Sequence, residues 1–146
     1  MRKIKTIPFE AAHFDLMELR GLEQQTIGTN RSKYEALAAA GTCGTMICDG
    51  RVLGVIGYYE FLPGNYEVFI LPSVYIAEYA IMFAKTVRAW LSSVAKSHPV
   101  QRFQTSCVDD DLHNRWMEFI GFKCETPNGM PNYVQGLTYK LWSRMV

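Results

Sequence analysis

The stretch that decides the fold is Glu67–Ala95, with the sequence EVFILPSVYIAEYAIMFAKTVRAWLSSVA. Its first residues, Glu67–Leu71, are mostly apolar and rich in β-branched and aromatic side chains, which predicts a strand. Pro72-Ser73 ends that strand, and no proline or glycine follows before Ser97, so a long helix is expected. A strand, a short turn and a buried helix are the arrangement that directs a helix N-terminus toward a ligand phosphate.

Length and composition bound the classes of protein that are possible. A chain of 146 residues corresponds to a single domain, 1–146, and a hydrophobic content of 49% is enough for a packed core. The net charge of +1 gives no broad basic surface, so nucleic acid is not expected as a partner. The apolar runs are too short for a membrane span, and no apolar signal core follows the basic N-terminus.

The spacing of the four cysteines indicates whether the protein belongs to a reducing or an oxidising compartment. They show no CxxC pairing and fall on predicted strands, which favours reduced, packed thiols in a cytoplasmic protein over a disulfide framework. The cysteines concerned are Cys43, Cys48, Cys107 and Cys124. His113 could start a metal site, but no second histidine or cysteine cluster with ligand spacing lies near it, so no metal is expected.

The first half of the chain predicts a short strand, two helices and an antiparallel meander. Ala12, Leu16, Leu19 and Leu22 recur at helical spacing and indicate a helix over Glu10–Gln25. The Asp-Gly pair at 49–50, between two strand-like runs, is a strong hairpin signal. The expected elements are a strand at Lys3–Pro8, a second helix at Arg31–Ala40, strands at Thr42–Cys48, Arg51–Phe61 and Tyr66–Leu71, and a tight turn at Pro63-Gly64-Asn65.

The second half closes the sheet. Apolar residues three or four apart predict one buried stripe along the long helix. The strand Arg102–Val108 follows that helix, so a right-handed crossover would make it a parallel neighbour of Tyr66–Leu71. The stripe consists of Ile76, Ala80, Phe83, Val87, Trp90 or Leu91, and Val94. The later elements are a helix at Leu112–Ile120, a strand at Phe122–Glu125, a loop at Thr126–Asn132 and a last strand from Tyr133 or Gly136 to Met145.

These elements predict an α+β fold, an α/β three-layer arrangement. The sheet is expected to be mixed and mostly antiparallel, with a central parallel pair and helices on both faces. Where two parallel strands lie side by side and a helix leaves one of them, the sheet can splay and form a crevice at the strand ends.

This order of elements resembles the GCN5-related N-acetyltransferase (GNAT) superfamily, which binds acetyl-CoA in such a crevice. In that family the long helix follows Gln/Arg-x-x-Gly-x-Gly/Ala, and the corresponding positions here are Tyr75, Glu78 and Ala80. Ala80 fits the motif, Tyr75 carries no positive charge, and Glu78 brings a carboxylate close to the phosphates. The resemblance implies acetyl-CoA as cofactor, held by backbone groups at Ile70, Leu71, Ser73, Ile76, Ala77 and Ala80, although Ser73 could instead be only a helix cap.

A second motif of the superfamily, Asn-x-x-Ala-x-x-(apolar)-Tyr-x-x-x-Gly-Phe, ends at Gly121-Phe122 here. Met117 stands where that motif has a tyrosine, and a thioether cannot donate a proton to a leaving thiolate. The run Asp110–Gly121 is similar to a stretch of the acetyltransferase-like internal virion protein A family of T7-type bacteriophages, with His113, Arg115 and Gly121 matching. That likeness implies a phage protein, located in the host cytoplasm or associated with the virion.

Two residues are candidates for removing a proton from an amine. His113 follows three aspartates, and a nearby carboxylate can orient an imidazole for acid–base work. The alternative for His113 is a structural place in a helix N-terminal turn in which Asp111 is the cap. Glu60 precedes the Pro63-Gly64 turn and could act as the base, or could be an exposed hairpin acid.

Two functions from different classes remain open at this stage. The first is an enzyme, an N-acyltransferase that moves an acetyl group from acetyl-CoA to an amine, with Glu60 or His113 as base. The second is a catalytically degenerate protein of the same fold that serves as a virion component or binds a host or phage protein. Glu78 and Met117 favour the second function.

Overall fold

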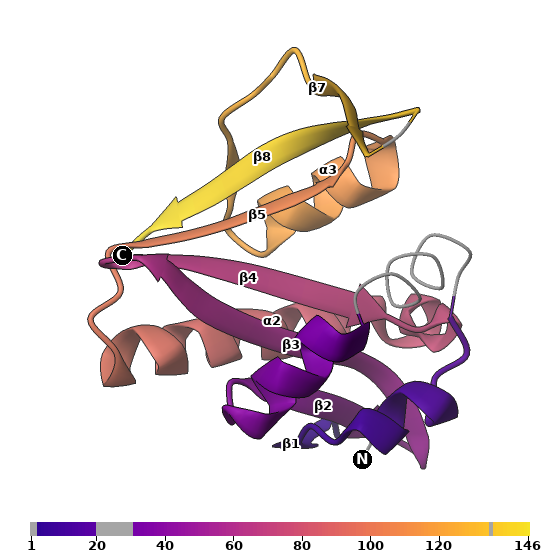
Figure 1. The fold of residues 1–146 in the computed structure, drawn as a ribbon. Helices are drawn as coiled ribbons and strands as arrows, with labels where there is room; N and C mark the ends of the chain where they lie inside the picture. Colours follow the sequence, from indigo (N-terminus) through magenta and orange to yellow (C-terminus); the bar gives the residue numbers. More distant parts are fainter. Residues whose placement is uncertain (1–2, 20–30, 135) are drawn as a thin grey trace. The chain divides into compact units, whose positions relative to one another are not determined.

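The computed structural model describes residues 3–19, 31–134 and 136–146. The strands are β1 (Lys5–Pro8), β2 (Cys43–Cys48), β3 (Arg51–Leu62), β4 (Asn65–Pro72), β5 (Arg102–Val108), β6 (Lys123–Cys124), β7 (Met130–Val134) and β8 (Leu137–Met145). The helices are two 3-10 helices, η1 (Ala11–Leu16) and η2 (Val74–Tyr79), and two α-helices, α2 (Ala80–Ser97) and α3 (Asp111–Phe119) (Figure 1). Residues 31–39 are also helical.

The strands form one mixed sheet in the order β1-β2-β3-β4-β5-β8-β6, with β7 paired to β8. Among the pairs with a described register, β4–β5 is parallel and the others are antiparallel. This confirms the predicted mixed sheet with its parallel pair. It also confirms the Asp-Gly hairpin, since Asp49 and Gly50 have φ angles of 52° and 74°, as a tight turn between two strands requires.

The chain divides into two compact units. The first consists of residues 1–59 and 69–83, the second of residues 60–68 and 84–146. The single domain expected from the chain length stays a prediction. In the first unit, aromatic rings and aliphatic side chains pack into one buried cluster: Phe9, Phe14, Met17, Tyr34, Cys43, Val52, Val55 and Leu71.

The second unit contains most of α2, all of α3 and the strands β5 to β8. Figure 1 shows β5 and β8 side by side, and their antiparallel register runs from Arg102↔Met145 to Val108↔Tyr139. Buried apolar residues of this unit include Val87, Leu91, Phe103, Met117, Ile120 and Trp142. The parallel ladder of β4 and β5 also lies here and covers three residue pairs, from Asn65↔Arg102 to Glu67↔Gln104.

The helix predicted over Glu10–Gln25 is wrong in its described part. The chain forms the short 3-10 helix η1 and is extended again at Met17, whose φ and ψ are −89° and 131°. Phe14 and Met17 are buried, whereas Leu16 of the predicted stripe is 66% exposed. A 3-10 helix has three residues per turn, so residues i and i+3 share a face and the 3.6-residue stripe does not apply. Leu22 and the rest of this prediction, 20–25, lie outside the described residues.

The long helix begins differently from the prediction. Its first six residues are the 3-10 helix η2, and the α-helix α2 starts only at Ala80. The tighter turn shifts the buried face, so Tyr79 is buried and Ala80 of the predicted stripe is exposed. From Phe83 onward the stripe is confirmed, with Phe83, Val87, Leu91 and Val94 all buried.

Two predictions in the C-terminal part need correction. The expected loop Thr126–Asn132 contains the start of β7, because Met130 pairs with Tyr139 across an irregular register. The helix α3 is capped by Asp110, not Asp111: the Asp110 side chain accepts a hydrogen bond from the backbone N–H of His113. Asp111 is the first helical residue instead.

Candidate functional site

The turn between β4 and η2 is fixed by hydrogen bonds around Ser73. The Ser73 side chain is fully buried, its N–H donates to the Leu53 carbonyl oxygen at 2.8 Å, and its Oγ accepts from the Tyr75 N–H at 3.3 Å. Ser73 is therefore the cap of η2. The strand β3 approaches this turn closely, because a Cβ on Gly54 would lie 2.9 Å from the carbonyl oxygen of Leu71.

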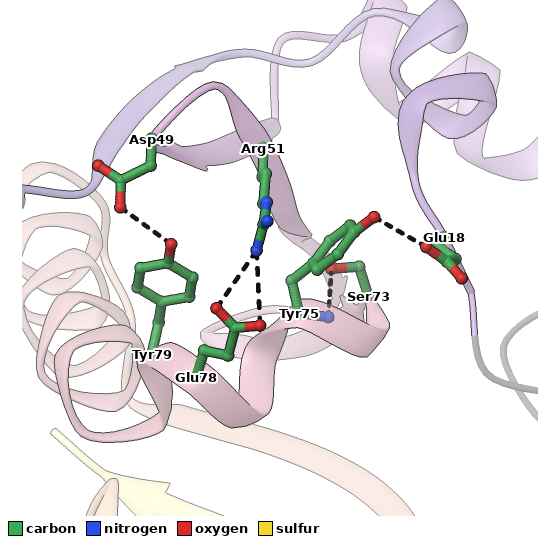
Figure 2. Close-up of polar contacts among 7 residues, drawn as sticks. All are labelled: Glu18, Asp49, Arg51, Ser73, Tyr75, Glu78 and Tyr79. Carbon is green, nitrogen blue, oxygen red and sulfur yellow. Dashed lines mark hydrogen bonds and ion pairs between the residues drawn. The ribbon is translucent and has the colours of Figure 1, made fainter.

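Glu18 and Leu19 also contact this turn. The N–H of Val74 donates to the Glu18 carbonyl oxygen at 2.8 Å, and Leu19 forms an isolated antiparallel bridge with Ser73. The Glu18 carboxylate accepts from the Tyr75 hydroxyl at 2.8 Å (Figure 2). That hydrogen bond raises the pKa of the Tyr75 hydroxyl, so the phenol stays protonated and acts as a donor.

An arginine from the β2–β3 hairpin reaches the same helix start. Arg51 Nη1 lies 3.2 Å from Glu78 Oε2, and its guanidinium lies 4.7 Å from the centre of the Tyr75 ring. On the other side of Glu78, the Tyr79 hydroxyl donates to Asp49 at 2.9 Å (Figure 2). Glu78 therefore points toward the hairpin, and its charge is compensated by Arg51. This ion pair is about half exposed, so it contributes little to stability.

This helix start fits an anionic carrier only in part. Arg51 supplies the cation that the motif position Tyr75 lacks. The N–H groups of Val74, Tyr75 and Ile76 are already bonded, to the Glu18 carbonyl, the Ser73 hydroxyl and the Ser73 carbonyl. Glu18 adds a second carboxylate next to the Glu78–Arg51 pair. A pyrophosphate would meet Arg51 as its cation here, but Arg51 is already paired with Glu78, and the Glu18 and Glu78 carboxylates both oppose the phosphates.

The predicted cofactor residues all belong to the first unit. Ile70 and Leu71 lie in β4, Ser73 is the cap, and Ile76 and Ala77 lie in η2. Ala77 and Ala80 are exposed, and Ile76 is half-buried. Their role in binding a cofactor stays a prediction.

Glu60 lies in the second unit, in the exposed last part of β3. Its Oε2 accepts a hydrogen bond of 2.9 Å from the N–H of Gly64, which has a φ of 77° in the turn to β4. The carboxylate thus holds the hairpin together, which accounts for a glutamate at this position without any catalytic role.

His113 lies in the first turn of α3, also in the second unit. Its Nδ1 is 2.7 Å from Asp110 Oδ1, and its side chain is 21% exposed. The neighbouring Asp109 is engaged elsewhere: it accepts from Asn114 at 2.9 Å and lies 3.2 Å from Lys140 Nζ. These two partners lower the pKa of Asp109.

Two of the four cysteines are poor nucleophiles. All four thiols are reduced. Burial raises the pKa of Cys107 to about 12 and that of Cys43 to about 11, so neither forms a thiolate near neutral pH. Within the described ranges, no group of three or more histidine, cysteine, aspartate or glutamate side chains could hold a metal ion.

Two residues of these clusters, Arg51 and Glu18, were not singled out from the sequence, and Asp110 was noted only as one of the three aspartates before His113. Arg51 is next to the predicted hairpin turn, and the strand order β2-β3-β4 would have indicated that it reaches the end of β4. Asp110 has a sequence signal, because it stands three residues before His113 at N-cap spacing. No sequence signal marks Glu18, which contacts a residue 57 positions later.

The strands and helices follow the order found in GNAT acetyltransferases, and the chain has their fold. A GNAT acetyltransferase from Bacillus anthracis aligns over 98% of this chain and 95% of its own, with a TM-score of 0.68 and 13% identity. For an acetyltransferase from Acinetobacter baylyi the shares are 100% and 94%, with a TM-score of 0.71 and 8% identity.

A microcin C7 self-immunity acetyltransferase, solved in complex with acetyl-CoA and AMP, aligns over 99% of this chain and 93% of its own. Its TM-score is 0.68 and its identity is 9%. No protein-family model matches the sequence, and no curated protein matches it. Within the described residues, no helix is long and apolar enough to cross a membrane.

Proposed function

We propose that the chain is an N-acyltransferase that transfers an acetyl group from acetyl-CoA to an amine. The observation that carries this proposal is the GNAT fold, which extends over nearly the whole of this chain and of its structural neighbours. One of those neighbours was solved with acetyl-CoA. When bound, acetyl-CoA supplies an acyl group activated as a thioester.

Each compact unit, taken by itself, offers one group of candidate residues. In the first unit, the backbone of Ile70 and Leu71 and the turn at Ser73, Ile76, Ala77 and Ala80 would hold the cofactor, with Arg51 facing its phosphates. In the second unit, His113 would remove a proton from the amine. We favour His113 over Glu60 because the Glu60 carboxylate already accepts the Gly64 N–H.

Two observations favour a second candidate, a catalytically degenerate GNAT-fold protein, for which the likeness of Asp110–Gly121 suggests a phage origin. Such a protein would act as a virion component or bind a host or phage protein, in the virion or the host cytoplasm. The backbone carbonyl oxygen of Glu18 accepts a hydrogen bond from the Val74 N–H at the helix start. Met117, at the motif's tyrosine position, is buried and has no proton to donate.

Thermal unfolding with and without millimolar acetyl-CoA separates the two candidates. A ligand that binds only the native state stabilises it by RT ln(1 + [L]/Kd), about 2.7 kcal/mol at a hundredfold excess over Kd. The enzyme proposal expects a rise in Tm with acetyl-CoA and a smaller one with adenosine alone. An unchanged Tm, together with crystals that take up no acetyl-CoA on soaking, would favour the degenerate candidate.

A further inference from the structure

The N-terminus of α3 holds a side-chain pair that helix capping does not fully explain. Asp110 Oδ1 lies 2.7 Å from the backbone nitrogen of His113 and also 2.7 Å from its ring nitrogen Nδ1. A cap needs only the first of these contacts. The second one fixes the imidazole of the residue whose backbone Asp110 already caps.

The backbone holds Asp110 in place on both sides. Its N–H donates to the Val108 carbonyl oxygen at 3.1 Å, and its own carbonyl oxygen accepts from the Asn114 N–H at 3.0 Å. The carboxylate is thus held between the end of β5 and the first turn of α3. Asp109 does not compete for the imidazole, because Asn114 and Lys140 hold its carboxylate.

The pair determines which ring nitrogen of His113 carries the proton. An ionised carboxylate can only accept hydrogen bonds, so Nδ1 must be the donor when the ring is neutral. The proton therefore sits on Nδ1 and the lone pair sits on Nε2. Within the described part of the chain, Asp110 is the one residue with which the His113 ring makes a polar contact, so Nε2 keeps its lone pair for a ligand.

We propose that Asp110 is a positioning residue that sets the tautomer of His113, and that Nε2 of His113 accepts the proton of the acceptor amine. This inference rests on the proposed function. Nε2 takes one proton from the ammonium form, R–NH3+, and leaves R–NH2 with a free lone pair. With acetyl-CoA bound, that lone pair would form the C–N bond to the acyl carbon while the C–S bond of the thioester breaks, and the proton that the new amide nitrogen loses would pass to the departing CoA thiolate. The imidazolium that results is paired with the Asp110 carboxylate, as in other histidine bases oriented by an aspartate.

Proton–nitrogen correlation spectra of the imidazole rings test the tautomer directly, in the full chain and without any substrate. Two of the three histidines are His13 and His98, so the spectrum of His113→Ala identifies the signals of His113. Asp110→Ser keeps a capping hydroxyl but removes the carboxylate, and Asp111→Asn removes a neighbouring charge that does not touch the ring. We expect neutral His113 to be protonated at Nδ1 in the wild type and in Asp111→Asn, and to shift toward the Nε2–H form in Asp110→Ser.

Kinetics with acetyl-CoA and a panel of polyamines and peptide N-termini test the catalytic part. Asp110→Ser should lower kcat at least tenfold and leave the KM for acetyl-CoA unchanged, whereas Asp111→Asn should retain the wild-type rate. An Nε2–H tautomer in the wild type, or a spectrum unaffected by Asp110→Ser, would overturn the positioning role. An Nδ1–H tautomer in a wild-type protein that transfers no acetyl group would support the positioning role and overturn the proposed function instead.

Discussion

Two helices of this protein start in similar ways and leave different chemistry available. At the start of η2, the capping oxygen of Ser73 accepts from Tyr75, and nearby side chains pair with one another: Arg51 with Glu78, Tyr75 with Glu18, and Tyr79 with Asp49. At the start of α3, the capping oxygen of Asp110 holds both the backbone and the ring of His113. There one ring nitrogen keeps its lone pair.

The difference shows why the N-terminus of a helix does not by itself define a binding site. Both starts have the dipole and the cap that favour anions. In η2 the first N–H groups are used by the chain itself, so a ligand must displace Glu18 or depend on Arg51. In α3 the cap fixes an imidazole and leaves it available. Substitutions at the start of η2 therefore test whether a ligand can bind there, and substitutions at the start of α3 test whether His113 is needed for catalysis.

The largest effect is expected from removing the imidazole. His113→Ala should lower the rate of acetyl transfer at least tenfold, since general base catalysis typically contributes about 10²–10⁴ in rate. The rate is measured as thiol release from acetyl-CoA with the amine of the panel that the wild type acetylates fastest. Glu60→Gln is the matched control, because the amide oxygen can still accept the Gly64 N–H. A wild-type rate in His113→Ala, or a collapse in Glu60→Gln, would exchange the roles of the two residues.

A smaller effect is expected from disturbing the backbone at the other helix start. Gly54→Ala would place a Cβ 2.9 Å from the Leu71 carbonyl oxygen and 3.3 Å from the Phe83 ring, so β3 and β4 would have to shift. Overpacking of this kind costs about 1–3 kcal/mol in the free energy of unfolding. Urea denaturation measures that cost.

Gly44→Ala is the control for this substitution. Its Cβ would meet the Thr6 methyl group at 2.8 Å, and that side chain is exposed on the edge strand β1 and can rotate away. We expect it to cost clearly less than Gly54→Ala. Equal costs for the two variants would mean that the approach of β3 to Leu71 is not tightly packed.

Much of the fold could be predicted from the sequence, because its signals are local. Asp49-Gly50 and Gly64 mark the two hairpin turns of the meander, and each has the positive φ that such turns need. The helix between β4 and β5 implied a parallel pair, and the register confirms it. Hydrophobic spacing located the buried stripe of α2 from Phe83 onward.

The errors arose where the helical period changes or where partners are far apart in the chain. η1 and η2 are 3-10 helices, so a period of 3.6 residues assigned Leu16 and Ala80 to the wrong face. Tyr75 is hydrogen-bonded to Glu18, and Glu78 is paired with Arg51. No local sequence pattern connects either pair. The candidate site was therefore predictable as a position after β4, and its charge balance was not.

The smallest effect is expected from neutralising the carboxylate at the helix start. Glu18→Gln keeps an oxygen that can accept from the Tyr75 hydroxyl and removes one negative charge near the proposed phosphate position. Because these groups are exposed and screened, we expect the affinity for acetyl-CoA to rise only about threefold, or less than 1 kcal/mol. Calorimetric titration at low and high salt measures this change, and the gain should shrink as salt increases.

Asp15→Asn is the matched control, because Asp15 is an exposed acid that pairs with Arg31 instead of the turn at Ser73. If both variants gain equally, the effect comes from net charge alone and Glu18 has no special place. If Glu18→Gln gains nothing while the wild type binds acetyl-CoA, the carrier does not approach the Tyr75 side of η2. Arg51 would then serve only as the partner of Glu78, and the start of η2 would have a structural role without contacting the cofactor.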